Sequence, residues 1–426
     1  MAYRIGIDAR MYSARFTGIG RYNYELIHHL AAIDAENTYV IFLNEPEFSE
    51  FEIFAPNIEK VLVNAKHYSL QEQTVFLQKL LAAKLDLMHF THFNSPLLFP
   101  GKQVVTIHDL TLSYYPGKKM TAAHYRAAYN LSIWSVTKKA AAVIAISENT
   151  KNDVISLLHV PAEKIRVVYE GAAETFTDDK RPEPIARVRS TYNLPRPFLL
   201  YAGVWRSHKN VAGLISAFAL MVKEYGYEGD LVITGRPDPL YTEVPETIAQ
   251  HGLEQRVHCV GLVPEEDLGV LFNAAELYVF PSFYEGFGLP ALEAFAAGVP
   301  LAASNTSCLP EICGEGNALF FDPHNPKNMA EVMMRGVQDQ ELRTQLIERG
   351  KKRLLDFSWR KMAEETLGVY LDILRAGHAP SKNSSWRAQS GFTYLRRHGP
   401  PLSPRQQKSI SLGCFPRTHR RRKNSI

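Results

Sequence analysis

The chain has 426 residues, of which 46% are hydrophobic and 22% charged, a composition typical of a globular protein with room for two cores. No apolar run approaches the roughly 18 residues that a membrane-spanning helix needs. The N-terminus lacks the apolar stretch of a secretory signal peptide, and the four cysteines have the spacing of neither zinc ligands nor a disulfide scaffold. We therefore expect a cytoplasmic protein with reduced thiols.

The positive charges are concentrated at the end of the chain. Eleven lysines and arginines and no acidic residue follow Arg375, so removing eleven charges from the net +4 leaves −7 for residues 1–375. This distribution argues against a nucleic-acid partner for the folded part. Residues 377–426 show no periodic apolar pattern, and we expect a basic disordered tail. The tail either binds anionic lipid or nucleic acid or is solvated without a function.

Strand-like and helix-like segments alternate from the start of the chain, with a first helix expected at about Gly20–Ala32. Strands are predicted at Tyr3–Asp8, Thr38–Leu43, Val61–Val63, Leu87–Phe90, Val104–Ile107, Val143–Ile146 and Ile165–Val168. Asp178–Pro197 is rich in proline and charge and is the candidate linker. This alternation predicts a parallel sheet covered by helices on both faces.

The same alternation begins again after the linker. Strands are predicted at Phe198–Ala202, Leu231–Thr234, Val257–Val260, Leu277–Phe280, Leu301–Ala303 and Leu319–Phe321. Helices are predicted at Val211–Tyr225, Glu265–Ala274, Pro290–Ala297, Pro326–Val337, Gln340–Leu355 and Trp359–Leu374. We expect an α/β protein of two Rossmann-like domains, residues 1–190 and 191–357, with residues 358–376 returning to the first. Ligands of such sheets bind at the carboxyl ends of the strands, which here would face a cleft between the domains.

The most informative segment is Phe280–Pro300, FPSFYEGFGLPALEAFAAGVP. A strand ends, a loop with two glycines follows, and Pro290 stands where the first turn of a helix should begin. Glycines allow a ligand close to the backbone, and free amides at a helix N-terminus bind anions such as a diphosphate. Glu285 on the loop and Glu293 on the helix would accept hydrogen bonds from hydroxyls of a sugar and of a ribose.

This segment resembles the retaining glycosyltransferases of family 4, which have the GT-B fold and carry two glutamates separated by seven residues. The resemblance covers about residues 3–375 and includes SNTSCLPE, VIAISENTKNDV and IRVVYEGAAETF. In the last of these, Glu170 and Ala172 replace common residues. The resemblance implies that the nucleotide sugar contacts Gly286, Phe287, Gly288 and Leu289 besides the two glutamates.

The loop GVWRSHKN, residues 203–210, is expected to complete the phosphate site. Lys209 matches the lysine that neutralises the donor diphosphate in the family. The arginine that often follows the glycine is replaced by Val204, and Arg206 or His208 is the candidate for the second cation. Positive charge there would stabilise the leaving nucleoside diphosphate without a divalent metal.

Two further elements of the first domain resemble the family. Gly18 and Gly20 open a helix after the first strand and match the loop that approaches the phosphates. His108 follows the strand VVTI and matches the histidine beside the reacting sugar, while His92 is a weaker candidate. A histidine that is merely part of the core is the alternative. The family implies that the acceptor hydroxyl attacks from the face of the departing phosphate, which takes its proton.

We expect a hexosyl transfer in polysaccharide or glycolipid synthesis. GDP-mannose is the first candidate donor and UDP-glucose the second, with a carbohydrate or lipid-linked acceptor. Pro116–Ala140 mixes lysines with aromatic residues and is either a membrane-surface segment at the inner face of the membrane or a solvated helix. A non-catalytic module that binds a nucleotide sugar is the rival class. An epimerase or a phosphorylase of the same fold lacks its required groups here.

Overall fold

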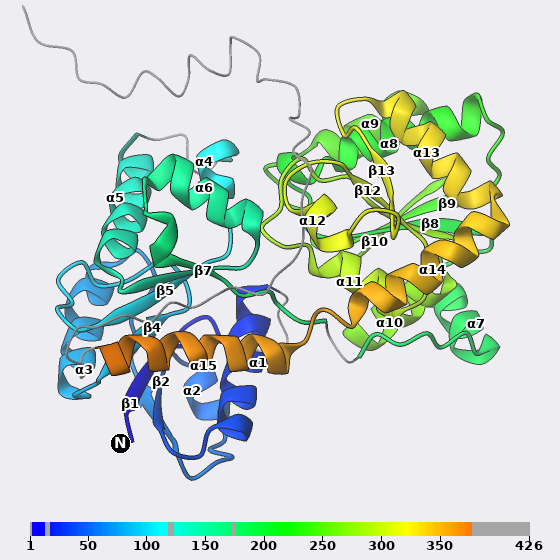
Figure 1. The fold of residues 1–426 in the computed structure, drawn as a ribbon. Coiled ribbons are helices and arrows are strands. Elements are labelled where there is room, and N and C mark those ends of the chain that lie inside the picture. The colour runs from blue at the N-terminus through cyan, green and yellow to red at the C-terminus, as the bar shows by residue number, and fades with distance from the viewer. Residues whose placement is uncertain (1, 13–17, 118–122, 173–174, 377–426) are drawn as a thin grey trace, which may run out of the picture. The chain divides into compact units, whose positions relative to one another are not determined.

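The computed structural model describes residues 2–12, 18–117, 123–172 and 175–376. All of them belong to one compact unit, Met1–His378, which contains two separate sheets (Figure 1). The basic tail 377–426, which the sequence predicts to be disordered, lies outside the described residues. None of the helices in the described ranges is both long and apolar enough to cross a membrane.

The first sheet has seven parallel strands in the order β3-β2-β1-β4-β5-β6-β7. The strands are β1 (Arg4–Asp8), β2 (Thr38–Leu43), β3 (Ile58–Leu62), β4 (Leu87–Phe90), β5 (Gln103–Ile107), β6 (Ala142–Ala145) and β7 (Ile165–Val167). β4, β5 and β6 are buried along their whole length, which explains their nearly continuous apolar sequences. This sheet and its helices are the first lobe.

The helices of the first lobe are α1 (Ile19–Ile33), α2 (Glu47–Glu50), η1 (Glu72–Phe76), α3 (Leu77–Ala82), α4 (Thr111–Tyr114), α5 (Ala123–Lys139), α6 (Glu148–Leu158) and η3 (Ala162–Lys164). The last described helix, α15 (Trp359–Ala376), returns to this lobe and packs beside α1 (Figure 1). Together α1 and α15 cover one face of the sheet. The side chains of α5 and of η1–α3 belong to the core on the other face.

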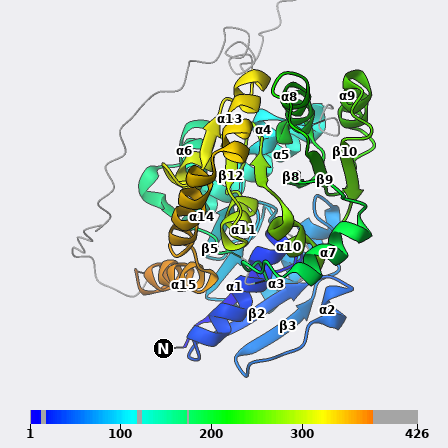
Figure 2. The ribbon, with the colours of Figure 1, turned by 90° about the vertical axis from the view of Figure 1, so that its right-hand side faces the viewer.

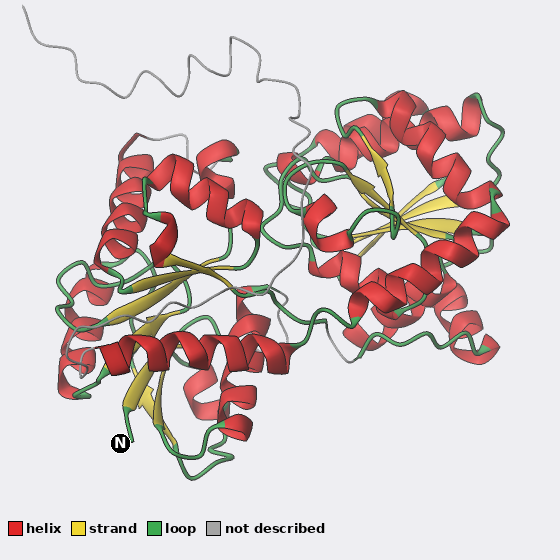
Figure 3. Ribbon diagram, in the orientation of Figure 1, coloured by secondary structure: helices red, strands yellow, loops and turns green. Residues whose placement is uncertain are grey.

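The second lobe has a six-stranded parallel sheet in the order β10-β9-β8-β11-β12-β13. The strands are β8 (Phe198–Ala202), β9 (Asp230–Thr234), β10 (Val257–Gly261), β11 (Leu277–Phe280), β12 (Leu301–Ser304) and β13 (Leu319–Phe321). The helices are α7 (Pro182–Thr191), η4 (Ser207–Lys209), α8 (Val211–Lys223), α9 (Glu243–His251), α10 (Glu265–Ala274), α11 (Leu289–Ala296), α12 (Leu309–Cys313), α13 (Pro326–Gln338) and α14 (Gln340–Leu354). Helices lie on both faces of this sheet (Figures 2 and 3).

The predicted alternation of strands and helices is confirmed, and most strand boundaries agree within one residue. The candidate linker 178–197 contains the helix α7, which the sequence analysis does not predict. This helix packs against α10, and Val188 lies in the core of the second lobe, so the helical period was hidden by its prolines and charges. The domain boundary at residue 190 stays a prediction.

In both lobes the chain changes direction at the centre of the sheet. β1 lies between β2 and β4, and β8 lies between β9 and β11. Ligands of such sheets bind outside the carboxyl ends of the strands at this switch point. The loops that follow β1, β5, β8 and β11 carry the candidate residues of the sequence analysis.

Candidate active site

Residues 281–288, which we call the signature loop, connect β11 to α11. Pro290 lies in the first turn of α11, where its missing N–H has no cost. Gly288 precedes the helix with a φ of 105°, and a Cβ there would lie 2.9 Å from the side chain of Leu309. None of the described side chains caps α11. Pro290 has no N–H and the Ala291 N–H donates to the Gly288 carbonyl at 2.9 Å, so an anion would be attracted by the positive end of the helix dipole more than by several free amides.

Glu285 of the signature loop forms an ion pair with Lys209. Lys209 Nζ donates to the two carboxylate oxygens at 2.7 and 2.8 Å, and the hydroxyl of Ser282 donates to the same carboxylate at 2.6 Å. The Lys209 and Glu285 side chains are 20% and 11% exposed. The structure thus places the predicted phosphate-binding lysine beside the predicted sugar-binding carboxylate, although 76 residues separate them in sequence.

The second cation of the phosphate site is better supplied by Arg206 than by His208. Arg206 is exposed at the start of η4. Burial, and next the positive charge of Lys209, lower the pKa of His208 to about 4. The imidazole of His208 is therefore neutral near neutral pH and contributes no charge.

Glu293 lies on α11 in a partly buried position near charges of both lobes. Burial, and next the negative charge of Glu265, raise the pKa of Glu293 to about 7, while Arg21 opposes the rise. Arg21 of α1 donates to Glu25 at 2.7 Å and to Glu265 of α10 at 3.1 Å. Glu293 therefore changes its charge near neutral pH, and Arg21 links the two lobes next to it.

His108 is buried directly after β5, and both of its ring nitrogens face oxygen atoms. Nδ1 lies 3.2 Å from a carboxylate oxygen of Glu170, and Nε2 lies 2.9 Å from the backbone carbonyl of Thr91. The ring of Tyr22 packs edge-on against the imidazole at 4.8 Å. The side chain is thus held by the segments that follow β4 and β7 and by α1.

Gly286 brings the signature loop into contact with His108. A Cβ at Gly286 would lie 2.1 Å from the His108 carbonyl oxygen and 3.0 Å from Cβ of Asp109. The Gly286 carbonyl accepts a hydrogen bond from the hydroxyl of Ser147 at 2.7 Å. The position therefore requires glycine, because the backbones of the two lobes meet here.

The other residues expected to bind the donor take different positions. Phe287 is buried in the core against Tyr169 and Phe357, so only its main chain is available to a ligand. Leu289 is partly buried and packs against the cores of both lobes. These two residues support the loop with their side chains.

Gly18 and Gly20 lie at the start of α1. Gly18 has a φ of 74°, and a Cβ there would meet nothing within 4 Å. Gly20 is buried in the first turn. None of the described side chains caps this helix, and its first turn has no acidic residue. Its amides are therefore available to an anion, as the resemblance implies.

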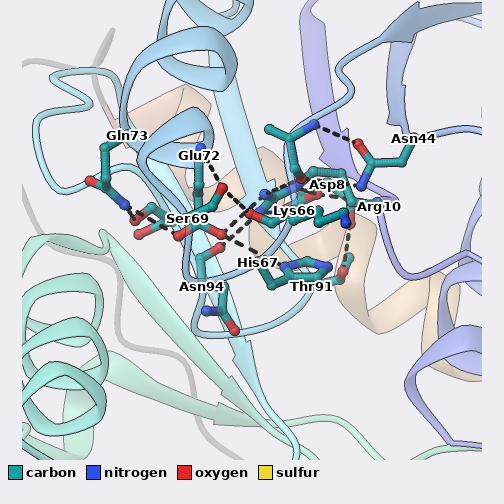
Figure 4. Close-up of polar contacts among 12 residues, drawn as sticks. Asp8, Arg10, Asn44, Lys66, His67, Ser69, Glu72, Gln73, Thr91 and Asn94 are labelled. Atoms are coloured by element: carbon teal, nitrogen blue, oxygen red, sulfur yellow. Dashed lines mark hydrogen bonds and ion pairs between the residues drawn. The ribbon is translucent and has the colours of Figure 1, made fainter. Parts of the chain in front are cut away.

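Arg10 forms a buried hub at the carboxyl end of β1 (Figure 4). It donates to Asp8 at 2.8 Å through both Nε and Nη2, and to Glu72 at 3.1 Å through Nη1. Backbone carbonyls of Ala65 and Asn94 accept its remaining hydrogens. The side chain of Arg10 thus connects four separate segments close to the switch point of the first lobe.

Helix α6 of the first lobe receives contacts from the second lobe at its N-terminus. The Glu311 carboxylate accepts the backbone N–H groups of Glu148 at 2.6 Å and Asn149 at 3.0 Å. Tyr284 of the signature loop donates to Asp153 at 2.6 Å. A carboxylate at a helix N-terminus is favourable, so these bonds hold the two lobes together.

Sequence reasoning missed several of these residues because their partners are distant in sequence. The sequence analysis assigns no role to Arg10, and it marks Glu170 only as a departure from the family motif. One signal was present, since charged residues directly after a buried strand, as in IGIDAR, must find partners. Among the described residues, no group of three or more His, Cys, Asp or Glu side chains is placed to hold a metal ion.

Two family models match the chain. Glycosyltransferase Family 4 matches residues 16–174, and Glycosyl transferases group 1 matches residues 183–353. The two ranges follow the two lobes and together take in more than half of the 426 residues. The chain is a GT-B glycosyltransferase. It is similar to O-antigen chain mannosyltransferase B of Escherichia coli, with 27% identity over 379 residues, 83% of this chain and 96% of that relative.

Solved structures share the architecture of this glycosyltransferase. Sucrose-phosphate synthase from Thermosynechococcus elongatus has a TM-score of 0.72 at 22% identity, over 88% of this chain and 100% of its own. HepE from Anabaena in complex with UDP-glucose has a TM-score of 0.68 at 16% identity, over 87% and 100%. Identities this low show the fold alone, and they confirm the predicted GT-B class.

Proposed function

We propose that this glycosyltransferase transfers mannose from GDP-mannose to a hydroxyl of a carbohydrate or lipid-linked acceptor, with retention at the anomeric carbon. The observation that carries the proposal is the Lys209–Glu285 pair on the loops next to the N-terminus of α11, which none of the described side chains caps. A cation and a helix N-terminus suit a diphosphate, and a carboxylate suits sugar hydroxyls. The choice of mannose follows the similarity to O-antigen chain mannosyltransferase B.

The site residues would divide the reaction between the two lobes. In the second lobe, Lys209 and Arg206 hold the diphosphate, Glu285 orients the sugar and Glu293 accepts the ribose hydroxyls. In the first lobe, His108 lies beside the reacting sugar. The bond between the anomeric carbon and the phosphate oxygen breaks while the acceptor oxygen attacks from the same face. The acceptor proton passes to the departing phosphate oxygen, and Lys209 stabilises the charge that develops there. This scheme requires no metal.

The test measures GDP or UDP released from a panel of nucleotide sugars. We expect release from GDP-mannose and a fall of about 10²–10³ in rate for Lys209→Ala. Lys223→Ala, which changes an exposed lysine at the end of α8, is the matched control and should keep the wild-type rate. Release from UDP-glucose instead would identify a glucosyltransferase. Binding of a nucleotide sugar without any release would identify a binding module.

We also propose that α5 contacts an anionic membrane surface. Tyr125, Leu131 and Trp134 are each more than half exposed on this helix, and Lys138 and Lys139 lie in its last turn. The apolar residues do not gather on one face, so the contact would rely on these side chains and on charge. Lys118 and Lys119, which the sequence analysis included, lie outside the described residues.

Vesicle sedimentation tests the membrane contact. Vesicles that contain phosphatidylglycerol should bind the protein at low salt and release it at high salt, while phosphatidylcholine vesicles should not bind it. Trp134→Ser should weaken the binding. If no vesicle binds the protein at low salt, α5 is a solvated helix. The predicted cytoplasmic location stays a prediction.

A further inference from the structure

Glu170 is a buried carboxylate that the proposed reaction does not yet use. It follows β7, is 3% exposed, and stands where the family resemblance leads us to expect a different residue. A carboxylate in such a place requires a partner that offsets its charge or donates to it. The structure provides His108 Nδ1 at 3.2 Å, across 62 residues of sequence.

The two contacts of the His108 ring restrict what the ring can do. A neutral imidazole has one N–H, but Nδ1 faces the Glu170 carboxylate and Nε2 faces the Thr91 carbonyl. Both oxygens only accept, so both contacts are hydrogen bonds only when both nitrogens carry hydrogen. In this arrangement neither nitrogen has a free lone pair, and His108 is not a general base for the acceptor hydroxyl.

Three other titratable groups near this pair are neutral near neutral pH. Burial, and next the charge of His108, lower the pKa of His89 on β4 to about 3 and hold the pKa of His92 well below its usual value. Burial raises the pKa of Tyr22 on α1. The carboxylate of Asp109, beside His108 on the same loop, accepts the backbone N–H of Thr111. Glu170 is thus the carboxylate in direct contact with the ring.

We propose that Glu170 is a positioning residue, which holds the protonated ring of His108 and offsets its charge beside the reacting sugar. The inference rests on the proposed function, since the sugar that departs from a diphosphate develops positive charge. An unpaired imidazolium would repel that charge, whereas the neutral Glu170–His108 pair does not. The first lobe would therefore place the Glu170–His108 pair, with a fixed orientation and no net charge, beside the sugar.

The experiment compares Glu170→Gln with Glu163→Gln in the full chain. Glu163 is an exposed glutamate shortly before β7, so the control makes the same chemical change away from the site. With ¹⁵N-labelled histidine and no donor, the wild type and the control should show protons on both ring nitrogens of His108. Glu170→Gln should show a single protonated nitrogen, because the amide cannot balance the second proton.

Turnover provides the second measurement. Glu170→Gln should lower kcat by about ten- to a hundred-fold, the loss expected for one hydrogen bond to a charged group, with little change in KM. It should also change the pH dependence of kcat, whereas Glu163→Gln should keep the wild-type profile. Glu170→Asp, which keeps the charge, should recover more of kcat than Glu170→Asn. The Asp and Asn variants also test the proposal if the Glu170→Gln variant does not fold.

The proposal is overturned if Glu170→Gln and Glu163→Gln give the same ring signals, or if the Asp and Asn variants have equal kcat. Failure of the proposed function looks different. In that case the wild type releases no nucleotide from any donor, while the ring signals still report whether Glu170 controls His108.

Discussion

The two lobes build their sides of the candidate site in different ways. In the first lobe, buried polar side chains pair with partners that are distant in sequence. Arg10 pairs with Glu72, and His108 pairs with Glu170. In the second lobe they come from short loops after β8 and β11, with Arg206 exposed and Lys209 partly exposed. One side is a fixed polar network, and the other offers cations and amides to a ligand.

This difference fits the division of labour that we propose. A diphosphate must enter and leave, so its site benefits from amides and cations that water or substrate can reach. The side chains beside a developing positive charge benefit from an orientation that is fixed in advance, because they need not reorganise during the reaction. The comparison predicts large stability effects in the first lobe and large effects on turnover where the lobes meet.

The largest effect is expected for Arg10→Met. The substitution leaves Asp8 and Glu72 buried without their cation, and breaking such a pair costs about 3–5 kcal/mol. Urea unfolding of the variant measures the free energy of unfolding. Arg181→Met, which breaks a solvent-accessible pair with Asp179 just before α7, is the control and should change little. Equal losses for the two variants would remove the contrast between the lobes.

The next effect is expected for Gly286→Ala. The new Cβ would lie 2.1 Å from the His108 carbonyl oxygen, so the signature loop must move away from the first lobe. A displacement of about 1 Å at reacting groups can cost about a hundred-fold in rate. Gly368→Ala in α15 is the control, since its Cβ would meet nothing within 4 Å. If both variants keep the wild-type kcat, the contact at Gly286 is not needed for turnover.

The contrast between the lobes also explains what could be predicted from sequence. The period of apolar residues predicted both sheets, because β strands and amphipathic helices are local patterns. The second-lobe site was also local. Pro290, Gly288 and Glu285 lie within a single strand–loop–helix segment, and their roles follow from the chemistry of helix termini and glycine turns.

The first-lobe site could not be predicted in the same way. The contact of His108 with Glu170 and the hub of Arg10 depend on which strands are neighbours, and sequence spacing does not reveal this. α7 was missed for another reason, since its prolines and charges look like a linker, and only Val188 packing in the core of the second lobe explains the helix. Tertiary packing decided both cases.

The smallest effect concerns Glu293, a partly buried carboxyl group on α11 of the second lobe. Its pKa is raised to about 7, first by burial and next by Glu265. The folded state therefore holds this proton more tightly than the unfolded state does. The contribution of Glu293 to stability is favourable below the ordinary glutamate range of about 4.3 and is lost as the pH rises to about 7.

Binding of a ribose should show the opposite trend, because the ionised carboxylate is the better acceptor for hydroxyls. Calorimetric titration with GDP should give a Kd that rises as the pH falls below about 7, by up to tenfold per pH unit. Glu293→Gln should bind GDP more weakly at high pH and lose the part of the pH dependence that comes from the carboxyl group. The diphosphate of GDP also ionises, but it does so equally with the wild type and the variant. The difference between the two pH profiles therefore reports Glu293 alone. A variant with the same pH profile as the wild type would show that Glu293 does not contact the nucleotide. The ribose would then be bound by other groups of the second lobe.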